Sequence, residues 1–98
     1  MVGAWEGLTH LALGSVLARI GKERYEEAEE CIERALIILN EYGLRPWLAN
    51  GILALGEIYA HSGQMKKAME ALRKAAGMFR EMEMEYWLER TKRVLEKL

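Results

Sequence analysis

The chain contains little cysteine, proline and aromatic residue, and each shortage limits what it can form. A single cysteine, Cys31, in 98 residues excludes an internal disulfide framework, so we expect a buried, reduced thiol within an amphipathic helix. The single proline, Pro46, stands where a helix can begin, so it interrupts no helical pattern. Strand-forming aromatic residues are few, and no alternating apolar and polar run reaches strand length. These absences predict an all-α fold.

Neither sign of charge dominates the chain, and no long hydrophobic run is present. The formal net charge is −1, which provides no general attraction to nucleic acid or to acidic membranes. No apolar run approaches the about 18 residues that a membrane-spanning helix needs. The first residues, 1–6, lack the basic region and apolar core of a signal peptide. We therefore expect a cytoplasmic protein without nucleic acid or membrane partners.

The residue patterns of catalysis and metal binding are missing as well. His10 and His61 stand 51 residues apart, and neither has a second ligand at metal spacing. A carboxylate-bridged metal site would need a Glu-x-x-His pair, which the chain lacks. No glycine-rich phosphate loop and no nucleophile–base set is found in the sequence. We expect no metal, no cofactor and no enzymatic activity, and a solvated acidic face formed by Glu26, Glu29, Glu30 and Glu33.

What the chain does contain is the periodicity of amphipathic helices, with apolar residues recurring at intervals of about 3, 4 and 7. Hydrophobic residues make up 51% of the chain and charged residues 30%, which is typical of one globular domain. The pattern predicts helices at about 4–20, 25–42, 46–61, 65–82 and 85–98. The inward face of the first helix is expected to carry Leu8, Leu11, Ala12, Val16 and Ile20.

The sequence also repeats. Trp5, Trp47 and Trp87 recur at intervals of 42 and 40 residues, each near the start of a helix of the same type. The pieces 12–14 and 54–56 are both Ala-Leu-Gly. The chain therefore reads as two helical hairpins plus a fifth helix that begins a third unit. We expect the tryptophans to pack at the junctions between repeats, since residues of an aromatic cage must converge on one point.

Small residues in the second hairpin predict a close approach of its two helices. Gly56 and Ala60 lie four residues apart on one helix, and Ala68 and Ala75 lie seven apart on the next. A glycine inside a helix costs roughly 1 kcal/mol relative to alanine, so close packing is the expected compensation at Gly56.

With these residues, the chain resembles the tetratricopeptide repeat family over essentially all of its 98 residues. The second hairpin matches the family pattern through Leu55, Gly56, Tyr59, Gly63, Ala68 and Ala75. The first matches it less fully through Leu13, Gly14, Gly21, Tyr25, Ala28 and Ala35. The resemblance implies a right-handed, antiparallel helix-hairpin stack in a single domain, 1–98. Its parts are a first repeat at about 4–42, a second at about 46–82 and a C-terminal capping helix at about 85–98.

The resemblance implies a non-catalytic protein–protein interaction scaffold, whose concave groove binds a peptide or a partner helix. The positions carried over to this groove are Leu8, Leu11, Ser15, Arg19, Asn50, Leu53, Glu57, His61, Arg90, Arg93 and Lys97. A groove that is apolar early and basic late suits a partner with apolar anchors followed by acids. The carboxylate clamp of some family members is not expected, because Leu11, Ser15, Ala54 and Val94 occupy four of its positions.

Two other functions remain open at this stage. Repeat arrays need about three repeats for independent stability, and this chain has two and a half. The chain is therefore also compatible with a homodimer, formed through the groove or through an open end of the stack. It is equally compatible with a part of a longer signalling or regulatory array.

Overall fold

The computed structural model describes residues 3–98, and this part of the chain forms five α-helices. Their bounds are α1 (Ala4–Ile20), α2 (Tyr25–Glu41), α3 (Arg45–His61), α4 (Met65–Glu81) and α5 (Glu85–Glu96), with a short 3-10 turn, η1 (Lys22–Arg24). No strand occurs within the described residues. The all-α prediction is confirmed, and the helix ends differ from the predicted ones by at most two residues.

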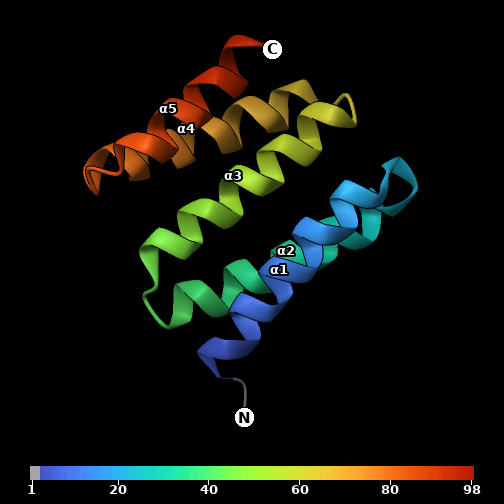
Figure 1. Cartoon of the computed structure of the whole chain (residues 1–98), viewed down its shortest axis with the longest axis vertical. Coiled ribbons are helices and arrows are strands. Elements are labelled where there is room, and N and C mark those ends of the chain that lie inside the picture. The colour runs from blue at the N-terminus through green and yellow to red at the C-terminus, as the bar shows by residue number, and fades with distance from the viewer. Residues whose placement is uncertain (1–2) are drawn as a thin grey trace.

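The helices form an antiparallel stack of hairpins (Figure 1). Helices α1 and α2 form the first hairpin, α3 and α4 form the second, and α5 packs on α4. The hairpins meet mainly through α2 and α3, while α1 contacts α3 only along a short stretch. Helices α1, α3 and α5 therefore share one layer, with α2 and α4 behind it (Figure 1). This arrangement confirms the predicted hairpin stack.

Three turns of the same construction join α2 through α5. Each contains one residue in the left-handed region, and these residues are 20 positions apart: Gly43 (φ 65°), Gly63 (φ 81°) and Glu83 (φ 56°). The following N–H donates to a carbonyl five residues back, as Leu44 does to Leu39 at 3.0 Å. This bond satisfies a carbonyl that the helix end would leave unpaired. The repeated turn gives successive helices the same spacing and direction.

Glu83 is the one turn residue of the three that carries a side chain at positive φ, and we expect Glu83→Gly to stabilise the fold by about 1 kcal/mol. The left-handed conformation costs a residue with a Cβ roughly 1–2 kcal/mol, and glycine avoids this strain. Glycine also has more conformational entropy in the unfolded chain, which offsets part of the gain. Arg80→Gly, within the last turn of α4, is the matched control and should lose about 1 kcal/mol. Urea unfolding of both variants measures the difference, and a destabilised Glu83→Gly variant would contradict the account of this turn.

Glycine and alanine allow the helices of each hairpin to approach closely. A Cβ placed at Gly14 would lie 2.6 Å from Cγ1 of Ile32, and one at Gly56 would lie 2.8 Å from Cδ2 of Leu72. Across from Gly56, Ala68 and Ala75 on α4 are fully buried. The close approach predicted for the second hairpin is confirmed, and the first hairpin uses the same device.

Two predictions about the first hairpin are wrong. Val16 and Ile20 of α1 are more than half exposed, because α2 packs on the side of α1 that carries Gly14. Ala12 is exposed for the same reason. Cys31 is only half-buried, although its Cβ lies 3.2 Å from a Cβ built at Gly14.

Candidate functional site

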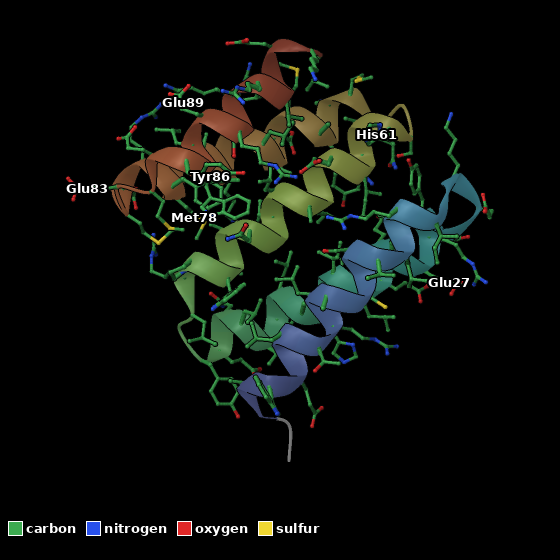
Figure 2. The ribbon with its side chains drawn as sticks, viewed as in Figure 1. Glu27, His61, Met78, Glu83, Tyr86 and Glu89 are labelled. Atoms are coloured by element: carbon green, nitrogen blue, oxygen red, sulfur yellow. The ribbon has the colours of Figure 1, made fainter. Side chains whose placement is uncertain are left out.

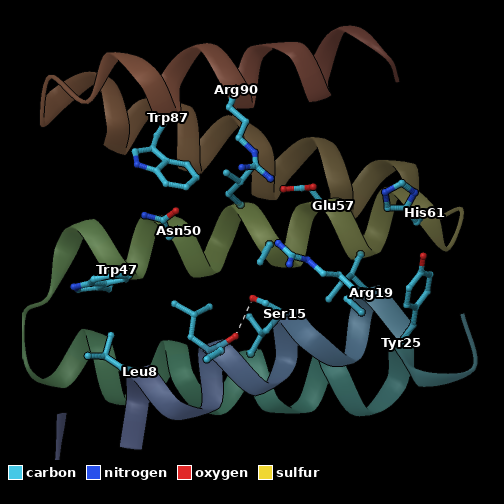
Figure 3. Close-up of a pocket in the computed structure, with 17 residues that line it drawn as sticks. Leu8, Ser15, Arg19, Tyr25, Trp47, Asn50, Glu57, His61, Trp87 and Arg90 are labelled. Carbon is cyan, nitrogen blue, oxygen red and sulfur yellow. Dashed lines mark hydrogen bonds between the residues drawn. The ribbon is translucent and has the colours of Figure 1, made fainter. Parts of the chain in front are cut away.

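A cavity of about 560 Å³ opens between α1, α3 and α5, on the layer that these three helices share (Figure 3). Nine of the eleven residues predicted for the groove line it: Leu8, Leu11, Ser15, Arg19, Asn50, Leu53, Glu57, His61 and Arg90. The helical period brings them together, because residues three and four apart lie on one face of a helix. We call this cavity the groove. That it binds a partner stays a prediction.

Arg93 and Lys97, predicted beside Arg90, do not line the groove. Arg93 holds the α5 position that corresponds to Leu11 of α1, but it is exposed and lies outside the groove. Lys97 follows the last helical residue, Glu96, and both basic side chains are exposed. The basic end of the groove is therefore smaller than the sequence predicted.

The floor of the groove is apolar and belongs to the core. Leu11 is 8% exposed and packs with Ala35 and Leu39 of α2. Leu53 is 2% exposed and belongs to the larger core cluster that includes Phe79. These two leucines were predicted as open groove contacts, but a ligand can touch only their edges. Substituting them with charged residues would test the stability of the fold rather than binding.

Charged side chains face one another across the middle of the groove. Figure 3 shows Arg19 from α1 and Arg90 from α5 directed toward the region beside Glu57 of α3. None of the ion pairs formed among residues 3–98 involves any of these three side chains. The Arg90 guanidinium lies 5.5 Å from the centre of the Trp87 ring, which holds it over the groove. The middle of the groove thus offers two cations and one anion without mutual pairing.

Ser15 and Asn50 contribute hydrogen-bonding capacity to the groove wall. The Ser15 hydroxyl donates to the carbonyl of Leu11 at 2.9 Å, and Asn50 Nδ2 donates to the carbonyl of Pro46 at 3.0 Å. The Ser15 hydroxyl proton and one N–H of Asn50 are thereby used within their own helices, which leaves both side-chain oxygens as acceptors and the second Asn50 N–H as a donor. Acceptors of this kind suit the N–H groups of a peptide.

The tryptophans do not behave as the repeat pattern predicted. Trp5 is 79% exposed rather than packed at a repeat junction, so its predicted role is wrong. Trp47 and Trp87 line the groove from equivalent positions of α3 and α5. Only Trp87 also packs as predicted, with its ring 6.2 Å from that of Phe79. The 40-residue equivalence could have placed both in the groove, because equivalent positions of stacked helices share a face.

One side chain with a shifted pKa lies outside the groove. Partial burial raises the pKa of the Tyr59 hydroxyl, and the negative charges of Glu29 and Glu33 on α2 add to the effect. Lys67 of α4 lies over the same ring, 5.5 Å from its centre. These contacts join α2, α3 and α4, so we assign Tyr59 a structural role.

Within residues 3–98, no three metal-ligating side chains come together in a cluster. None of the helices in that range combines the length and apolar character needed to cross a bilayer.

Comparison with known families gives a match that covers most of the stack. A sequence model described as Tetratricopeptide repeat matches residues 6–81, which include most of α1 and all of α2, α3 and α4. The matched segment is more than half of the 98 residues. Comparisons with curated proteins and with solved structures gave no match.

Proposed function

Since the chain belongs to the tetratricopeptide repeat family, whose repeats mediate protein–protein interactions, we propose that its groove binds a short segment of a partner protein. The observation that carries the proposal is the unpaired set of charges above an apolar floor in a cavity of about 560 Å³. Ligand cavities in proteins measure about 300–1,000 Å³ and combine apolar walls with a few polar groups.

The groove chemistry indicates what the segment carries. An apolar side chain fits the end where Leu8 and Trp47 lie, and a carboxylate fits the middle, where Arg19 and Arg90 converge (Figure 3). A carboxylate there would form charge-assisted hydrogen bonds, which are about twice as strong as neutral ones. Glu57 beside the same position disfavours a second acid. We therefore propose a peptide or helix with an apolar anchor and a single acidic residue, rather than an acidic run.

The proposed role is non-catalytic, in the cytoplasm, with neither nucleic acid nor a membrane as partner. Its support is the net charge of −1 and the free thiol of Cys31, which suits a reducing compartment. Membership of a longer regulatory array is compatible with the same groove function, because each added hairpin would extend the same layer.

Selection from a displayed library of random peptides tests the groove. The enriched peptides are expected to share an apolar residue followed by one Asp or Glu. Reversing both cations, with Arg19→Glu and Arg90→Glu, is expected to weaken their binding about a hundredfold, or roughly 1.4 kcal/mol for each arginine. Isothermal titration of the two proteins with one enriched peptide measures this difference.

The matched control carries the same change of charge on the outer surface of α4. Arg73→Glu with Lys74→Glu alters two exposed cations that do not line the groove, and it should leave peptide affinity within about twofold of the parent value. Equal binding by the groove variant and the parent, with both still helical by circular dichroism, would overturn the proposal.

A further inference from the structure

The outer face of α1 carries an apolar stripe that no described helix covers. It consists of Trp5, Thr9, Ala12, Leu13, Val16 and Ile20, which we call the α1 stripe. At 3.6 residues per turn, these positions fall within about 100° of the helix circumference. None of them is charged, and the exposed fractions of Leu13 and Val16 are 47% and 54%. In Figure 1, α1 lies at the edge of the stack, which leaves this face open.

The internal repeat shows what packs on the equivalent faces of the other helices. Leu13 and Val16 correspond, 42 residues later, to Leu55 and Ile58 of α3. There the two positions are 8% and 3% exposed, because α2 packs on them. The same face of α5 is covered by α4, where the equivalent of Thr9, Thr91, is fully buried. On both α3 and α5, a neighbouring antiparallel helix covers this face.

The residues of α2 that contact α3 are regularly spaced, and the residues of the α1 stripe have the same spacing. On α2, Tyr25 meets His61, Ile32 joins the α3 cluster, and Leu36 lies where a Cβ at Gly51 would meet it. With Glu29, which acts on Tyr59, these positions follow a spacing of 4, 3 and 4 residues. The stripe positions 5, 9, 12 and 16 follow the same spacing. The α1 stripe therefore presents side chains at the same spacing as the face of α2 that packs on α3.

The stripes of two copies can also pack against each other when a two-fold axis passes near the middle of α1. Such an axis makes the two α1 helices antiparallel and pairs positions whose numbers sum to 25. Trp5 of one copy then faces Ile20 of the other, and Thr9 faces Val16. At the centre Ala12 faces Leu13, which alternates small and large side chains. No pair brings two charges together.

The opposite end of the stack does not offer a competing surface. The positions of α5 that correspond to Gly7, Leu11 and Gly14 of α1 are Glu89, Arg93 and Glu96, all exposed. Figure 2 shows Glu89 directed away from the body of the molecule. A head-to-tail array would bury this charged face, whereas a two-fold contact through α1 leaves it in water.

We propose that the α1 stripe is a self-association surface, through which two copies of this chain pair by antiparallel packing of their α1 helices. A 17-residue helix is about 25 Å long. A contact between two such helices buries less surface than a standard interface, which buries about 800 Å² on each partner. The dimer is therefore expected to dissociate on dilution. Of the six stripe residues, Ala12 also lines the groove, while the other five lie outside it.

Sedimentation equilibrium of the full chain across a roughly hundredfold dilution tests the proposal. The parent protein is expected to change from dimer to monomer, and Val16→Glu is expected to be monomeric throughout, because its charge would face Thr9 in an apolar contact. Ile37→Glu is the matched control: Ile37 is 63% exposed on α2, outside the stripe, so this variant should dimerise as the parent does.

A charge pair tests the register. Adding Thr9→Lys to Val16→Glu places a lysine of each copy opposite a glutamate of the other, and it is expected to restore association at least tenfold over Val16→Glu alone. Thr9→Glu with Val16→Glu should remain monomeric. A parent protein that is monomeric at every concentration would overturn the proposal, as would a dimer that Val16→Glu leaves intact. A parent protein that stays monomeric would indicate that a helix of a different protein packs on the stripe.

Discussion

Gly14→Val is expected to destabilise the fold by about 3 kcal/mol, a large part of the 5–15 kcal/mol that holds a domain folded. A Cβ at this position would lie 2.6 Å from the Ile32 side chain and 3.0 Å from the backbone carbonyl oxygen of Ala28. A side chain can rotate away, but a helix carbonyl cannot, so α1 must move off α2. Overpacking of this kind costs about 1–3 kcal/mol, and the two extra methyl groups of valine favour the upper end.

Gly77 supplies the matched control for this substitution. It lies inside α4, and a Cβ built on it meets nothing within 4 Å. Gly77→Val should therefore change stability by no more than about 0.5 kcal/mol, since valine is slightly the better helix former. Urea unfolding of both variants measures the contrast. A Gly14→Val protein as stable as the Gly77→Val protein would show that α1 and α2 are further apart than described.

Phe79→Ala is expected to cost about 3–5 kcal/mol, as truncations of fully buried aromatic residues do. Phe79 is the largest of the fully buried side chains in the described chain. It belongs to the cluster that joins α3, α4 and α5, and its ring lies 6.2 Å from that of Trp87. Removing the ring takes away the support of the helix that carries Trp87 and Arg90. Loss of groove binding should therefore accompany the loss of stability.

Tyr86→Ala is the control for this second prediction. Tyr86 also contacts Trp87, at 5.2 Å between ring centres, but it is 69% exposed. Its truncation should cost about 0.5 kcal/mol or less. Thermal and urea unfolding distinguish the two variants, and similar losses for both would contradict the assignment of Phe79 as the centre of the core.

The elements that the sequence predicted well are those set by local patterns. Helical periodicity and the glycines at 43 and 63 located the helices to within two residues. Gly56, Ala68 and Ala75 located the close contact within the second hairpin. Glu83 had no such signal, because a non-glycine residue at positive φ is uncommon and leaves no mark in the sequence. The third turn could be inferred only from its 20-residue spacing from the other two.

The errors concern which apolar face meets a neighbour. Helix α1 is apolar on both sides, and periodicity alone cannot show that Gly14 faces α2 while Val16 faces water. The burial of Leu11 depends on its contact with α2, and that of Leu53 on the cluster that joins α3, α4 and α5, and both are tertiary properties. The two Trp residues of the groove were missed because the tryptophan repeat was assigned to junctions. Arg93 was included because the family positions were carried over to α5, where this position is exposed and lies outside the groove.

The central claim is that the groove between α1, α3 and α5 binds a peptide. The three tryptophans test it in one experiment, because Trp47 and Trp87 line the groove while Trp5 lies on the α1 stripe. A titration of the ¹⁵N-labelled protein with an enriched peptide, followed through the indole N–H signals, should shift the signals of Trp47 and Trp87. The Trp5 signal should respond to protein concentration instead. A peptide that binds and shifts only Trp5, or none of the three, would contradict the claim.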